Sequence, residues 1–261
     1  MGIQKSNKIN SLLNSWPYGT IAVSSWLKKQ GVSAQLAAVY KKSGWIESVA
    51  HGAFVHAGDK VSWSGGLFAL QEEMGLVVHA GGRTALQLHG SAHFLPLSAD
   101  HPVFLFGLRR TLPNWFIKYS WGMIVCNVYT HCFPYKERTG LTERKMEAYS
   151  VWLSTPELAM LEVLYLVGRR ESYQNAFLLM EGLNTLRPDL VQELLEKCSS
   201  VKVKRLFMHL AEQFKHPWLQ YVNVDKINFG KGKRVVEAGG YFDSKYDLSV
   251  PGASSKDKQW T

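Results

Sequence analysis

Hydrophobic residues along the first sixty positions follow helical spacing three times and then alternate as in strands. The first predicted helix ends at residues 17–19, and the second ends at Gly31, which suits a left-handed C-cap. Ser33 is placed to cap a third helix over residues 34–42. Residues 45–49 and 53–56 predict a hairpin that turns at residues 51–52. The apolar residues behind these patterns are Ile9, Leu12, Leu13, Trp16, Ile21, Val23, Trp26, Leu27, Leu36, Val39, Tyr40, Ile46, Val49 and Val55.

Three short helices followed by a hairpin are the order of a winged helix-turn-helix domain. In such a domain the turn before the third helix sets that helix against the major groove of duplex DNA. Small residues near its start allow close approach, and amide or basic side chains beyond them suit bases and phosphates. The DNA contacts are therefore expected from Ser33, Gln35, Ala38, Lys41 and Lys42 on the helix, and from His51 and Gly52 at the wing tip. A winged helix used for protein contact alone is the alternative.

Beyond residue 60 the pattern mixes short strands with longer helices. Residues 59–66 predict a junction, and Thr155 with Pro156 predicts the start of a buried helix. Further helices are expected over residues 67–74, 84–89, 173–182, 188–197 and 201–214, strands over 76–79, 103–106, 123–129 and 146–154, and a hairpin over 241–250. The predicted class is α+β: a winged helix-turn-helix over residues 1–60, then a larger mixed α/β domain with a helical C-terminal part over 61–251, and a flexible tail over 252–261.

The formal net charge of +9 is concentrated in two separated blocks. Residues 1–60 hold seven lysines against two acids, and residues 197–234 hold nine cations against two acids. Such blocks are typical of proteins that bind a polyanion, because neutralised phosphates release their counterions. A solvated lysine face is the alternative for either block. The second block comprises a possible basic patch of Lys202, Lys204, Arg205, Lys231, Lys233 and Arg234.

Patterns that would indicate an enzyme or a cofactor site are missing from the sequence. The nine histidines form no metal-ligand pair, and no phosphate loop or nucleophile elbow occurs. Three cysteines without a CxxC pair argue against a disulfide framework and a structural zinc site. No apolar run is long enough to span a bilayer, and no secretory signal opens the chain. We expect a cytoplasmic protein that is not an enzyme, needs no cofactor and has no membrane partner.

Several stretches, in order along nearly the whole chain, resemble the AbiEi-type antitoxin and transcriptional regulator family of type IV toxin–antitoxin and abortive-infection systems. The N-terminal stretches are WLKKQGVSAQLAAVYKKSGWIESVAHGAFVHAGDKVSW at 26–63 and GGLFALQEEMGLVVHAGGRTALQLHGSAHFLPL at 65–97. The others are STPELAMLEVLYLV at 154–167, MEGLNTLRPDLVQELLE at 180–196, VKVKRLFMHLAEQ at 201–213, and residues 216–251.

This resemblance implies a repressor that binds inverted repeats in its own promoter through the winged helix. It also implies that the C-terminal α+β domain counteracts a cognate nucleotidyltransferase-type toxin without needing a stable complex. One departure is the wing turn, where Ala50-His51-Gly52 stands in place of an expected arginine or lysine. The alternative hypothesis is an interaction protein that captures a toxin or another acidic partner directly and does not bind specific DNA.

Overall fold

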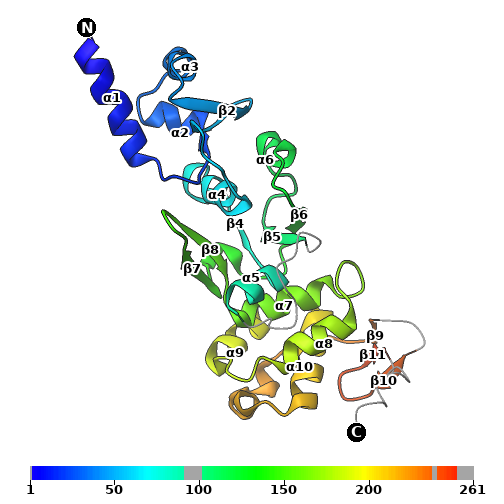
Figure 1. The fold of residues 1–261 in the computed structure, drawn as a ribbon. Helices are drawn as coiled ribbons and strands as arrows, with labels where there is room; N and C mark the ends of the chain where they lie inside the picture. The colour runs from blue at the N-terminus through cyan, green and yellow to red at the C-terminus, as the bar shows by residue number, and fades with distance from the viewer. Residues whose placement is uncertain (1, 91–101, 237–239, 252–261) are drawn as a thin grey trace. The chain divides into compact units, whose positions relative to one another are not determined.

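The computed structural model describes residues 2–90, 102–236 and 240–251, which form two compact units (Figure 1). The first unit combines residues 1–80, 98–129 and 142–153, and the second combines residues 81–97, 130–141 and 154–261. The tail predicted over residues 252–261 lies outside the described residues. The boundary predicted after residue 60 stays a prediction, and residues 61–80 cluster with the winged helix in the first unit.

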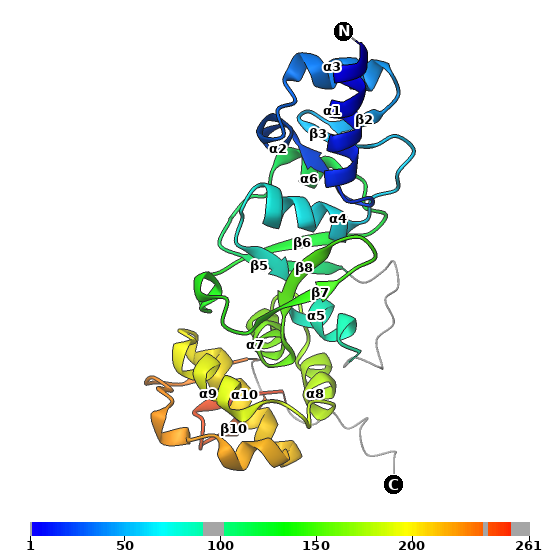
Figure 2. The same ribbon diagram turned by 90° about the vertical axis from the view of Figure 1, so that its left-hand side faces the viewer.

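The first unit begins with the predicted winged helix-turn-helix. Its helices are α1 (Gly2–Ser15), α2 (Ser24–Lys29) and α3 (Ala34–Lys42), and its strands are β1 (Ala22–Val23), β2 (Ile46–Ala50) and β3 (Ala53–His56). The strands form an antiparallel sheet in the order β1-β3-β2. Figure 2 shows the three helices gathered on this small sheet. Their shared core is Ile9, Leu12, Trp16, Ala22, Leu27, Val32, Ala37, Tyr40 and Ile46.

Two sequence expectations for this domain are wrong in detail. Residues 21–23 do not belong to the second helix, because Ala22 and Val23 pair with Phe54 and Ala53 as strand β1. Val39, whose place in the apolar pattern of the third helix implies the core, is 49% exposed. Ala37 is buried in the shared core instead.

A five-stranded sheet follows in the order β6-β5-β4-β8-β7. Its strands are β4 (Val78–Ala80), β5 (Val103–Gly107), β6 (Val125–Tyr129), β7 (Leu141–Lys145) and β8 (Ser150–Ser154). The central strand β4 pairs antiparallel with β5 and parallel with β8. Helix α4 (Trp63–Phe68), the π-helical turn η1 (Ala69–Glu73) and α6 (Asn114–Lys118) belong to the same unit. Strand β7 and helix α6 were not predicted, and β8 is shorter than the strand expected over residues 146–154.

The predicted junction over residues 59–66 is also wrong at its end, because α4 begins at Trp63 and contains Gly65 and Gly66. A Cβ atom on Gly65 would lie 1.8 Å from the Gly19 carbonyl oxygen, and one on Gly66 would lie 2.3 Å from the Trp121 ring. These glycines allow the helix to pack closely against its neighbours, so they do not mark a loop.

The second unit is mainly helical. It holds α5 (Gly82–Leu88), α7 (Pro156–Leu166), α8 (Tyr173–Glu181), α9 (Pro188–Lys197) and α10 (Val201–Phe214), with short 3-10 turns η2 (Tyr135–Glu137), η3 (Pro217–Tyr221) and η4 (Val224–Lys226). Helix α7 begins after Thr155 as predicted and is buried on all sides. Within it, the Glu162 carboxylate accepts hydrogen bonds from the Gly82 amide and the Tyr135 and Ser154 hydroxyls, at 2.7–2.8 Å.

A small sheet completes this unit beside α10. Strands β9 (Arg234–Val235), β11 (Leu248–Val250) and β10 (Tyr241–Asp243) lie in the order β10-β11-β9, and the predicted hairpin pairs β10 with β11. The α+β class and the N-terminal winged helix-turn-helix are thus confirmed.

Candidate nucleic-acid interface

Helix α3, the expected recognition helix, begins and ends where the sequence predicts. Ser33 caps it, since its hydroxyl oxygen accepts a hydrogen bond from the Leu36 amide at 3.2 Å. Ser33, Gln35, Ala38, Lys41 and Lys42 are all exposed, so the predicted contact residues lie on the solvent side of this helix. The small residues lie near the start of the exposed face and the lysines lie at its end.

Helix α2 adds a second pair of lysines that sequence reasoning missed. Lys28 and Lys29 are exposed in its last turn, just as Lys41 and Lys42 are in the last turn of α3. Gly31 has a left-handed φ of 75°, and the Val32 amide then donates to the Leu27 carbonyl at 2.8 Å, which fixes the turn between the helices. Since the first helix of such a motif crosses the DNA backbone, its lysine pair suits phosphates. The repeated Lys-Lys at both helix ends was the available sequence signal.

The wing is a short hairpin tied to α2. Gly52 turns with a φ of 76°, and its carbonyl accepts a hydrogen bond from the Ser24 amide at 2.9 Å. His51 is exposed and Gly52 is half-buried, so His51 is the predicted wing residue that projects to solvent. The wing therefore presents an imidazole at a position held against the start of α2.

The charge of this surface is uniform because no acid precedes Glu47 in the sequence. Both acids of the first sixty residues bind main-chain amides away from α2 and α3. Glu47 accepts from Gly58 at 2.9 Å, and Asp59 accepts from Gly19 at 2.6 Å. The lysines on the two helices thus have no carboxylate among their helical neighbours, which favours a polyanionic partner.

A buried carboxyl group lies behind the helix-turn-helix. Glu73 of η1 is 5% exposed, and its Oε2 accepts a hydrogen bond from the amide of Val23, the residue before α2, at 2.7 Å. Its Oε1 has no hydrogen-bond partner among the described residues. Burial raises the pKa of Glu73 to about 8, although the Val23 amide opposes that rise. The group is therefore protonated in the folded chain at neutral pH and ionised in the unfolded chain.

We expect the free energy of unfolding to fall as pH rises from about 4.5 to about 8, because the folded state holds the Glu73 proton throughout that window. Glu73→Gln mimics the protonated side chain. It should therefore remove this pH-dependent loss of unfolding free energy, which amounts to about 1.4 kcal/mol per pH unit. Urea unfolding of both proteins at pH 6 and pH 7 measures it. Equal losses of stability in both proteins would contradict a protonated Glu73.

The helical part of the second basic block is largely buried, so it forms neither the exposed basic patch nor the solvated face that the sequence left open. Lys204 and Arg205 are 4% and 2% exposed, and burial lowers the pKa of Lys204. Lys202 is half-buried and donates to the Val167 carbonyl at 2.8 Å. The reason is that α10 is covered on several sides, by α7, by α8 and by strand β11. Lys231 and Lys233 are exposed and Arg234 is half-buried, so the loop carries the accessible part of this block.

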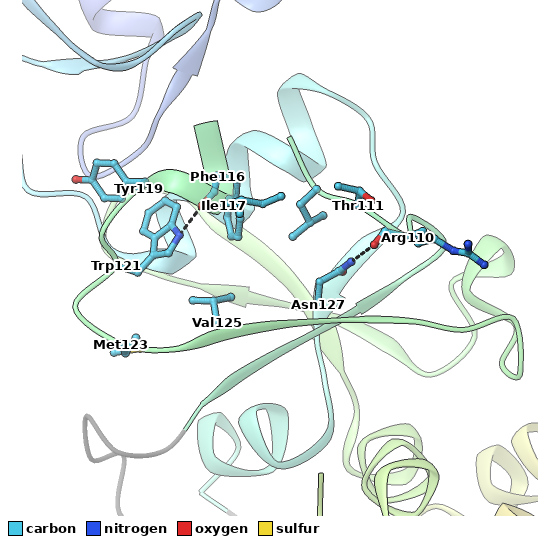
Figure 3. A pocket seen from close by; sticks show the side chains of 10 residues that line it. Arg110, Thr111, Phe116, Ile117, Tyr119, Trp121, Met123, Val125 and Asn127 are labelled. Carbon is cyan, nitrogen blue, oxygen red and sulfur yellow. Dashed lines mark hydrogen bonds between the residues drawn. The ribbon is translucent and has the colours of Figure 1, made fainter. Parts of the chain in front are cut away.

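A pocket of about 240 Å³ lies in the first unit between α6 and strand β6 (Figure 3). The Trp121 indole nitrogen donates to the Phe116 carbonyl at 2.9 Å, and the Asn127 amide nitrogen donates to the Arg110 carbonyl at 3.1 Å. None of the predicted contact residues lines this pocket, which sequence reasoning missed. Its walls come from Arg110, Thr111, Leu112, Phe116, Ile117, Tyr119, Trp121, Met123, Val125 and Asn127.

Across residues 2–90, 102–236 and 240–251, no group of three or more His, Cys, Asp or Glu side chains is placed to hold a metal ion. None of the helices there combines the length and the hydropathy needed to cross a membrane.

Two family models together match almost the whole chain. Residues 5–97 match the model described as "Transcriptional regulator, AbiEi antitoxin N-terminal domain". Residues 100–251 match the model described as "Transcriptional regulator, AbiEi antitoxin, Type IV TA system". No curated protein matches the sequence.

Among solved structures, the chain is similar to the RV2827C protein from Mycobacterium tuberculosis. The two share 11% sequence identity with a TM-score of 0.59, over 94% of this chain and 90% of that chain. At this identity the likeness concerns the fold alone.

Proposed function

Because the chain belongs to the AbiEi antitoxin family of type IV toxin–antitoxin systems, whose members are transcriptional regulators, we propose that it represses its own promoter by binding duplex DNA. The observation that carries this proposal is the acid-free surface of α2 and α3, with a lysine pair at the end of each helix. In this proposal α3 enters the major groove, where Gln35 reads a base edge and Ser33 with Ala38 permits close approach. Lys41 and Lys42 bind the flanking phosphates, and His51 with Gly52 meets the backbone beside the wing.

Inverted repeats are the operator that this arrangement would use. A single winged helix reads one half-site, so two copies of the chain would occupy the two halves of the repeat. Phosphate contact at the wing should be weaker than with an arginine there, since the imidazole of His51 is a poorer phosphate ligand than arginine when it is neutral.

For the other half of the family's role, we propose that the domain over residues 61–251 counteracts a nucleotidyltransferase-type toxin. This part of the proposal rests on the family, whose model covers residues 100–251. It involves binding and regulation, not a chemical step of this chain's own. A stable complex with the toxin is not required.

A gel-shift titration of the full-length chain tests the DNA-binding proposal. The probes are the region upstream of its own gene and a scrambled duplex of equal length, each at two salt concentrations. We expect the upstream probe to bind at least a hundredfold more tightly than the scrambled one, since specific sites commonly exceed non-specific ones by about a thousandfold or more. Equal, weak binding to both probes would contradict the proposal. A stoichiometric complex with the toxin in that case would favour direct capture instead.

A further inference from the structure

The loop between η4 and β9 has a backbone shape set by two glycines. Gly230 and Gly232 have left-handed φ values of 62° and 79°. A Cβ atom on Gly230 would lie 2.7 Å from Cγ2 of Val201, so this loop packs closely on the start of α10. The glycines alternate with Lys231 and Lys233, so every second residue from Gly230 to Lys233 has a left-handed backbone conformation. We call residues 229–234 the basic loop.

Arg205 of α10 holds the basic loop from inside. Its guanidinium donates to the carbonyls of Phe229 at 2.9 Å, Gly230 at 3.2 Å and Gly232 at 2.6 Å. A fourth bond, at 3.2 Å, reaches the Asp247 carbonyl next to strand β11. Since the side chain is 2% exposed, this is a buried cation satisfied by main-chain oxygens. The carbonyls of Phe229, Gly230 and Gly232 therefore point toward α10.

Among the described residues, the main-chain amides of Lys231, Gly232 and Lys233 bind no protein acceptor. Where right-handed and left-handed backbone conformations alternate, successive main-chain amides form a concave binding site for anions. Both lysine side chains are exposed, and residues 226–236 contain four cations and no acid. The loop thus combines main-chain donors with positive charge at one place.

An exposed aromatic ring lies beside these donors. The Lys233 Nζ lies 4.8 Å from the centre of the Phe242 ring, and Phe242 is 37% exposed. In the small sheet Phe242 stands opposite Ser249, and Ser249 stands opposite Val235, which is 60% exposed. This row forms the outer face of the sheet, since Leu248 on the other face is fully buried.

From these features we infer that the basic loop and the outer face at Phe242 form a binding site for single-stranded nucleic acid. A phosphate binds the three amides and the two lysines of the loop. Once Lys233 pairs with that phosphate, its contact with the Phe242 ring is released and the ring can stack on the adjacent base. Stacking on a protein ring requires an unpaired base, which is why a single strand fits and a duplex does not. This site is independent of the proposed promoter binding by α3.

Fluorescence anisotropy of the full-length chain with a labelled 12-nucleotide oligo-uridine tests the site, with a duplex of equal length as the second probe. We expect Lys231→Gln with Lys233→Gln to weaken binding of the single strand at least tenfold. Phe242→Ala should weaken it about fivefold or more, because one stacked base contributes about 1–3 kcal/mol. The matched control is Lys136→Gln with Lys215→Gln, which removes the same charge from exposed positions of the same unit and should change binding less than twofold.

Each other outcome overturns the inference. An equal loss in the control variant would mean that net charge alone attracts the strand. Loss of single-strand binding on replacing Lys41 and Lys42 with alanine would assign it to the winged helix. Competition by poly-glutamate as effective as by oligo-uridine would indicate an acidic protein partner. Promoter binding by the loop variant should stay at the wild-type level, so failure of this site and failure of the repressor proposal are told apart.

Discussion

Replacing Lys41 and Lys42 together with alanine should weaken promoter binding roughly 30-fold at about 0.15 M salt. Each phosphate contact contributes about 0.9 to the slope of log K against log salt, so two lost contacts lower that slope by about 1.8. The loss should be nearly the same for the operator and for a scrambled duplex, because phosphates carry no sequence information. Both lysines are exposed in the last turn of α3, so folding should not change.

The measurement is a gel-shift titration at four salt concentrations with both probes, and circular dichroism checks that the variant folds. Lys136→Ala with Lys226→Ala is the control, since it removes two exposed positive charges from the second unit. A variant that keeps the wild-type slope would contradict the assignment of α3 as the helix in the groove. A control that loses as much affinity would show that overall charge, and not the position of the lysines, governs binding.

Removing the Arg205 guanidinium is the second change with a large expected effect. Arg205→Met removes four hydrogen bonds from the guanidinium to main-chain carbonyls, which should reduce the free energy of unfolding by roughly 3–5 kcal/mol. Arg205→Lys keeps the charge but cannot reach four acceptors at once, so we expect an intermediate loss. Arg170→Met is the matched control, because Arg170 is exposed.

Chemical denaturation of the full chain measures the global effect, and hydrogen exchange locates it. The Arg234 and Val236 amides donate to the Asp247 and Ser249 carbonyls at 2.9 and 2.8 Å. Faster exchange at these two amides is expected in Arg205→Met because the small sheet loses its anchor on α10. If both quantities match those of the Arg170→Met control, Arg205 does not hold the basic loop.

Local signals in the sequence were sufficient to predict the bounds of an element where those bounds depend on the element's own residues. Ser33 and Gly31 fix the two ends of the turn before α3, and that helix spans the predicted residues 34–42. The helices over residues 188–197 and 201–214 also begin and end as predicted. The family resemblance, drawn from stretches along nearly the whole chain, is confirmed by the two matching models.

The sequence predictions were wrong where a contact between residues far apart in the sequence determines the local structure. Gly65 looks like a loop residue in the sequence, and only the position of the Gly19 carbonyl explains its place in a helix. Arg205 has the spacing of a surface cation, yet its acceptors lie 24 to 42 residues further along the chain. Lys28 and Lys29 were not predicted as phosphate ligands, because that role depends on how α2 would cross the DNA backbone, which no local pattern shows.

The bond between the Ser24 amide and the Gly52 carbonyl has a kinetic consequence for a DNA reader of this design. With the wing fastened to α2 and the turn fixed by Gly31, the surfaces proposed to contact DNA would lose little conformational freedom on binding. Encounter is then limited by diffusion and orientation, and the lysines accelerate it by long-range attraction. Differences in residence time among operator variants should therefore arise in dissociation, and the association rate should be shared by all of them and fall as salt is added.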